Sequence, residues 1–247
     1  MVNGLSCDLR MRITTVDNYL RTRPGVVGYV VRDRVSGGSY ANGNANAPIW
    51  TASTIKLATA ADLLTRNRSG ALHLSGGDYA DIDRMLHTSD DDAADRLWFA
   101  YAGPDHLAFN NAFRGFGMTG LVPQAGFTRF YPYWGFQKCS AADLDRLMTH
   151  VLTGLHPDDR NYLVTRMRTV DANQQWGVWG AGPAQRPGLK DGWSEEQGGW
   201  VVNSVGFVGP GERYTLAIMN SLNGQGQFKD GAATDTQVAK LLFNGLS

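Results

Sequence analysis

The sequence predicts an α+β fold in which an antiparallel sheet is built from both ends of the chain and a helical lobe is inserted between them. Three observations predict it: a strand pattern near the start, helical patterns through the middle, and a strand pair with a final helix at the end. We therefore expect one domain over residues 1–247. Its α/β lobe would come from about 1–50 and 185–247, and its helical lobe from about 51–184.

The first part of the chain predicts a helix followed by a hairpin. Apolar residues recur at helical spacing over 13–23, and Pro24-Gly25 ends this pattern. Residues 26–35 are rich in Val and Tyr, which predicts a strand, and the Ser/Gly run 36–39 turns the chain back toward Tyr40.

The middle of the chain carries helical patterns and one irregular segment. The helices are expected over 51–66, over 81–102 in two pieces separated near Thr88-Ser89, over 141–155 and over 157–168. The segment 103–138 is rich in Gly, Phe and Tyr, which is typical of a long packed loop. Its crowded aromatic residues could line a pocket or fill the core.

The end of the chain returns to strand patterns. Residues 200–208 and 213–220 alternate apolar and polar side chains across the turn 209–211, which predicts an antiparallel pair. A final helix is expected over about 232–246.

Composition excludes several function classes. The chain has 23 Lys+Arg against 23 Asp+Glu, so it lacks the basic excess of a nucleic-acid-binding protein. No apolar run approaches the roughly 18–20 residues that cross a bilayer, and Asp8 and Arg10 interrupt any signal-peptide core. We expect a soluble chain, cytoplasmic as given and exported if a signal peptide has been removed.

The cysteines and histidines predict no metal or cofactor. Cys7 and Cys139 are far apart in the sequence and form no CxxC pair, so free thiols are the simplest interpretation, although pairing stays open. The five histidines form no HxxxH or HExxH pattern. The oligomeric state also stays open.

One helix start carries a candidate nucleophile. In Ser53-Thr54-Ile55-Lys56 the first and last residues lie on one helical face, so the amine of Lys56 can reach the hydroxyl of Ser53. A serine is a weak nucleophile by itself, and a neighbouring amine that burial keeps neutral can accept its proton. Alone, this spacing also fits an ordinary helix start.

Two further motifs follow at helix and strand boundaries. Ser89-Asp90-Asp91 precedes the helical run 92–97, and by itself it fits an N-cap with acidic residues in the first turn. Lys190-Asp191-Gly192 precedes the C-terminal strand pair. Each motif is common alone, whereas the three in this order are uncommon.

Together these motifs resemble the signature S-x-x-K, S-D-N and K-T-G of class A β-lactamases and penicillin-binding proteins. The resemblance covers nearly the whole chain. It extends through the segments TASTIKLATAADLL, MLHTSDDDAADRLW, SAADLDRLMTHVL, GLKDGW, GGWVVNSVGFV and YTLAIMNS. It implies a β-lactamase/transpeptidase-like fold with its site between the lobes.

The resemblance also implies roles for individual residues. Ser53 would form an acyl-enzyme, and Lys56 would be its general base or would organise its hydrogen bonds. Ser89 would pass a proton to the leaving group, assisted electrostatically by Lys190. The backbone N–H groups of Ser53 and Trp193 would form the oxyanion hole.

The chain departs from the family at two substrate-binding positions. Asp91 replaces an asparagine, so an amide donor becomes a carboxylate that can only accept. Asp191 replaces Thr or Ser beside Gly192 and Trp193, where a carboxylate would repel the carboxylate of a penicillin. Asp191 could instead pair with Lys190 or select a cationic substrate.

A third departure concerns the hydrolytic step. Class A enzymes activate the deacylating water with a glutamate of the omega loop, yet no Glu or Asp occurs between Asp105 and Asp143. The spacing from Ser53 to Ser89 is also shorter than in class A enzymes, which predicts a more open cleft.

These observations predict a serine-dependent acyl-enzyme hydrolase or acyltransferase that acts on an ester or amide of a small molecule. It would be weak or inactive as a β-lactamase. Two alternatives stay open. One is a penicillin-binding-like sensor or pseudoenzyme that is acylated without turnover, and the other is a specialised-metabolism enzyme that uses the same cleft for cyclisation or isomerisation.

Overall fold

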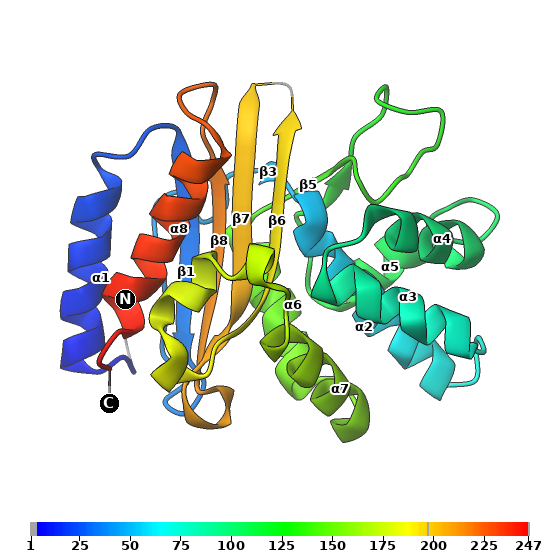
Figure 1. Ribbon diagram of the computed structural model, residues 1–247, viewed down its shortest axis with the longest axis horizontal. Helices are drawn as coiled ribbons and strands as arrows, with labels where there is room; N and C mark the ends of the chain where they lie inside the picture. The colour runs from blue at the N-terminus through cyan, green and yellow to red at the C-terminus, as the bar shows by residue number, and fades with distance from the viewer. Residues whose placement is uncertain (1–3, 197, 247) are drawn as a thin grey trace.

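A five-stranded antiparallel sheet of order β2-β1-β8-β7-β6 forms the centre of the structure, a computed structural model that describes residues 4–196 and 198–246 (Figure 1). Its strands are β1 (Val26–Asp33), β2 (Ser39–Ala41), β6 (Gly188–Glu196), β7 (Gly199–Val208) and β8 (Tyr214–Ser221). The N-terminal β1 pairs along its length with the C-terminal β8. The predicted α+β fold with a sheet from both chain ends is therefore confirmed.

Helices cover both faces of this sheet (Figure 1). One face packs against α1 (Cys7–Leu20) and α8 (Phe228–Phe243), and the other against α6 (Ala141–Thr153) and α7 (Pro157–Arg168). Alternate strand residues enter two separate apolar clusters: on β8, Leu216 and Ile218 join the cluster with α1 and α8, whereas Ala217 and Met219 join the other.

The remaining helices lie beyond the edge strand β6 (Figure 1). They are α2 (Ile55–Arg68), α3 (Gly76–His87), α4 (Asp91–Tyr101) and α5 (Ala108–Gly115). Every residue of α2 from Ile55 to Leu64 is buried, so α2 is the central helix of this region. A small sheet of β3 (Ile49–Trp50), β5 (Gln137–Cys139) and β4 (Val122–Pro123) also contributes.

Element boundaries differ from the sequence prediction where local hydrogen bonds outweigh the apolar pattern. Helix α1 begins at Cys7, before its apolar face starts, because Ser6 accepts a hydrogen bond from the N–H of Leu9 at 3.1 Å. Helix α8 begins at Phe228, where Gln227 and Asp230 form a capping box.

The segment 103–138 is not one long loop, because it contains α5, β4 and β5. The pattern-based prediction also missed strand β6. Lys190 and Asp191 within it are polar although they are buried, so they interrupt the apolar pattern by which a strand is predicted.

No helix in the described part of the chain is both long and apolar enough to span a bilayer.

Candidate functional site

Ser53 lies in a short 3₁₀ turn, Ala52–Thr54, that leads directly into α2. Ala52 has φ +44°, in the left-handed region that residues with a Cβ rarely adopt. Such strain costs about 1–3 kcal/mol and persists where the surroundings impose it.

Two neighbours impose this conformation. The buried amide of Asn203 on β7 donates to the carbonyls of Trp50 at 2.8 Å and Thr51 at 3.2 Å. On β6, a Cβ at Gly192 would lie 2.7 Å from the backbone nitrogen of Ser53, so only glycine fits there. The sheet therefore holds the backbone of the candidate nucleophile, whose side chain is half-buried.

Lys56 carries a buried amine with three partners. Its side chain is 1% exposed, and its Nζ donates to the carbonyl of Ser89 at 2.7 Å and to Oδ1 of Asp91. The same Nζ lies 4.6 Å from the centre of the Trp134 ring. Burial lowers the pKa of Lys56, and the neighbouring Asp91 carboxylate partly offsets this. Among the described residues, no hydrogen bond joins Lys56 to Ser53, so this expected contact is not formed.

Ser89 connects Lys56 to the second buried lysine. Lys190 Nζ donates to the hydroxyl of Ser89 at 2.9 Å and to the carbonyl of Asp191 at 2.7 Å. Burial lowers the pKa of Lys190 to about 7, and repulsion from Lys56 contributes to the shift. Ser89 has φ +63°, and it turns its carbonyl toward one lysine and its hydroxyl toward the other.

Asp191 lies away from this group, contrary to the sequence interpretation. Side chains alternate along β6, so Lys190 points toward Ser89 and Gly192 faces Ser53, whereas Asp191 and Trp193 point toward the α8 face. The Asp191 side chain is fully buried, and burial raises its pKa well above the usual range. It therefore does not line the cleft beside Ser53 that is described next, and the expected repulsion of a substrate carboxylate does not arise from it.

An open cleft of about 270 Å³ lies beside Ser53. Its lining consists of Ala52, Ser53, Asp91, Tyr133, Trp134, Gly135, Phe136, Trp193 and Ser194. The cleft thus combines the candidate nucleophile, one carboxylate and several aromatic rings. Trp193 contributes to this lining while its ring packs against Trp176 and Phe228, with centroids 6.0 and 5.5 Å away.

Sequence reasoning missed residues that shape this cleft. Asp95 accepts hydrogen bonds from the hydroxyl of Tyr133 and from Trp134 Nε1, the latter at 2.7 Å, and so fixes the aromatic wall. Asp95 lies four residues after Asp91 on α4, so the two acids share one helix face. This spacing could have identified Asp95 as a candidate site residue from the sequence. Asn203, within an apolar strand pattern, offered no comparable signal.

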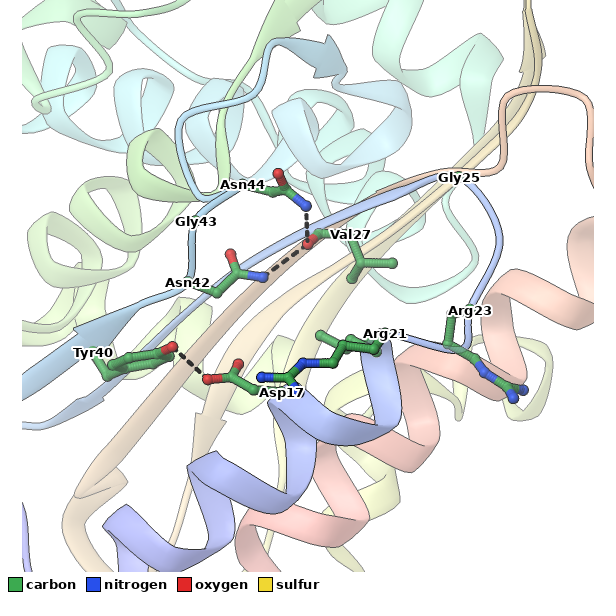
Figure 2. Close-up of a pocket in the computed structure, with 10 residues that line it drawn as sticks. Asp17, Arg21, Arg23, Gly25, Val27, Tyr40, Asn42, Gly43 and Asn44 are labelled. Carbon is green, nitrogen blue, oxygen red and sulfur yellow. Dashed lines mark hydrogen bonds between the residues drawn. The ribbon is translucent and has the colours of Figure 1, made fainter.

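The structure describes a second pocket, of about 310 Å³, between α1 and the segment 42–44 (Figure 2). There the carboxylate of Asp17 accepts from the hydroxyl of Tyr40, and the amides of Asn42 and Asn44 donate to the carbonyl of Val27 (Figure 2). These polar groups satisfy one another, and the pocket contains none of the motif residues. The cleft at Ser53 is therefore the candidate site.

Within residues 4–196 and 198–246, no group of three or more His, Cys, Asp or Glu side chains could hold a metal ion. Cys7 is exposed, Cys139 is buried, and both are free thiols.

The chain is similar to "Putative lipoprotein LppW" of Mycobacterium tuberculosis and of Mycobacterium bovis. It is 30% identical to each over 96% of this chain and 75% of the relative. No family model matches the chain.

Solved structures of β-lactamases share the fold. A β-lactamase from Xanthomonas campestris superposes with a TM-score of 0.77 at 20% identity, covering 98% of both chains. A β-lactamase from Streptosporangium roseum has a TM-score of 0.75 at 17% identity, covering 94% of this chain and 97% of that one. An ancestral class A β-lactamase has a TM-score of 0.75 at 18% identity, covering 95% and 98%. The resemblance to the class A β-lactamase fold is thereby confirmed.

Proposed function

Since this chain belongs to the family of LppW and has the fold of class A β-lactamases, we propose that it is a serine-dependent acyl-enzyme hydrolase or acyltransferase. Its substrate would be an ester or amide of a small molecule. The observation that carries the proposal is the pair of buried lysines, Lys56 and Lys190, which meet at Ser89 beside the cleft of Ser53. Burying an ammonium group costs several kcal/mol, and lysines with lowered pKa values in a cleft are typical of catalytic sites.

Acylation uses these groups in a defined order. The hydroxyl oxygen of Ser53 attacks the substrate carbonyl carbon, and its proton passes to the neutral amine of Lys56 and on to that of Lys190. The N–H groups of Ser53 and Trp193 stabilise the oxyanion, since β6 is an edge strand and alternate N–H groups point away from β7. The hydroxyl of Ser89 then protonates the leaving group and recovers its proton from Lys190, which lies 2.9 Å away.

We expect activated esters to be better substrates than β-lactams. The carboxylate of Asp91 lines the cleft and cannot donate to the amide carbonyl that penicillins carry, and a lost hydrogen bond of this kind costs about 1–3 kcal/mol. The kcat/KM for p-nitrophenyl acetate should therefore exceed that for nitrocefin by about 10–100-fold, measured by absorbance on the same enzyme sample. Faster turnover of nitrocefin than of the ester would contradict this substrate assignment.

We expect acylation to accelerate as the pH rises through about 7. The pKa of Lys190 is about 7, so below this pH the amine of Lys190 is protonated and cannot take up a proton that leaves Ser53. The burst rate with an activated ester should fall about tenfold per pH unit below 7 and level off above it. In Lys190→Met the group that titrates near pH 7 is gone, so this step in the pH profile should disappear. A burst rate that stays the same from pH 5.5 to 8.5 would show that the protonation of Lys190 does not control acylation.

Acylation without turnover is the second candidate function. It is favoured by the absence of Glu and Asp between residues 105 and 143, where class A enzymes carry their deacylating base. A sensor of this kind would release one equivalent of product and then stop, whereas a hydrolase continues.

The name of the related protein LppW supports a proposal about where in the cell this chain works. LppW is named as a lipoprotein, a class anchored to a membrane by a lipid. We propose on this basis that the chain works outside the cytoplasm, which is the second of the two locations that the sequence left open.

A further inference from the structure

We propose that Asp91 is the general base that activates the water in hydrolysis of the acyl-enzyme. The inference rests on the proposed function and deepens it, because it supplies the group that the omega-like segment lacks. It assigns a hydrolytic step to a residue that the motif comparison places only in substrate binding.

The position of Asp91 suits a base. Asp91 is the first residue of α4, and the preceding Asp90 caps this helix by accepting from the N–H of Ala93 at 2.8 Å, so the backbone there is fixed. One carboxylate oxygen of Asp91 accepts from Lys56. The side chain is nevertheless 72% exposed and lines the same cleft as Ser53, so water that enters the cleft can reach it.

The other acidic side chains near the cleft either accept other hydrogen bonds or lie outside the cleft. Asp95 is occupied by Tyr133 and Trp134, and Asp90 by the helix N-terminus. Asp92 is exposed on α4 outside the cleft lining. Among the described residues that line the cleft, only Asp91 carries a carboxylate.

The step is balanced in atoms and protons. Water adds its oxygen to the acyl carbonyl carbon while one of its protons moves to the carboxylate of Asp91. The tetrahedral intermediate collapses, and the bond between the carbon and the Ser53 oxygen breaks. Asp91 passes its proton to the amine of Lys56 through their hydrogen bond, and Lys56 passes a proton to the Ser53 oxygen, so that the carboxylate and the neutral amine are both restored. The products are a free carboxylic acid and the original serine.

Asp91→Asn tests the proposal. The asparagine oxygen can still accept from Lys56, but the amide cannot take a proton from water. With p-nitrophenyl acetate, the acyl-enzyme should still form and should decay about 100-fold more slowly than in the wild type, since general bases contribute about 10²–10⁴-fold. Intact-protein mass spectrometry after rapid quenching follows both phases. The matched control is Asp92→Asn, which removes the same charge from the same helix turn and should decay like the wild type.

A second measurement separates a lost base from a blocked cleft. Hydroxylamine attacks esters without a general base, so it should release the acyl group from Asp91→Asn. Decay of Asp91→Asn at the wild-type rate, or failure of hydroxylamine to release the acyl group, would overturn the role of Asp91 while leaving the serine mechanism intact. If the wild type forms no acyl adduct, the proposed function falls and this inference falls with it.

Discussion

Ser53→Ala is expected to lower the rate of ester acylation by about 10³-fold or more, the loss typical of removing a catalytic nucleophile. The reason is chemical, because alanine leaves no oxygen to attack the carbonyl carbon. Stopped-flow measurement of the p-nitrophenol burst gives the rate directly. The fold should be retained, since the backbone of the turn is held by Asn203 and not by the serine side chain.

The matched control for this variant is Ser69→Ala. Ser69 caps the far end of α2, where its hydroxyl donates to the carbonyl of Arg66 at 3.0 Å. This control should acylate at the wild-type rate. A Ser53→Ala burst of more than about one-tenth of the wild-type rate would contradict Ser53 as the nucleophile.

Lys56→Met is expected to lower acylation about 10³-fold while leaving the protein equally or more stable. Methionine keeps the length and apolar contact beside Trp134 but cannot accept a proton. Replacing a buried charge by an apolar side chain is often neutral or stabilising by about 1–4 kcal/mol, and the freed carboxylate of Asp91 stays hydrated because it is 72% exposed.

Burst kinetics and urea unfolding measure the two effects of Lys56→Met separately. Lys240→Met, an exposed position on α8, is the control and should change neither quantity. Loss of several kcal/mol of stability together with normal acylation would show that Lys56 is a structural residue.

Much of the fold was predictable because its patterns are local. The strand patterns near both chain ends and the break between α3 and α4 at Ser89 follow from apolar periodicity and capping. The order of the three motifs then indicated which helices and strands meet. Strand β6 escaped because it carries buried polar residues that break the apolar pattern, and the short strands β3, β4 and β5 were not predicted either.

The site was less predictable because its contacts join residues far apart in the sequence. Asp191 was assigned to the cleft, but strand alternation turns it to the opposite face from Lys190, and this follows only once β6 is known to be a strand. The contact of Lys56 with Asp91, 35 residues away, depends on how α2 and α4 pack, which no local pattern encodes.

The most direct test of the serine mechanism is intact-protein mass spectrometry over time, with peptide mapping. The enzyme would be treated in turn with a fluorophosphonate, benzylpenicillin and activated esters, and Ser53→Ala would be treated in parallel. The account predicts one adduct per molecule, located on Ser53 and missing from the variant; the fluorophosphonate adduct persists, and the ester adduct appears and decays. No adduct with any reagent, or an adduct that Ser53→Ala retains, would contradict it.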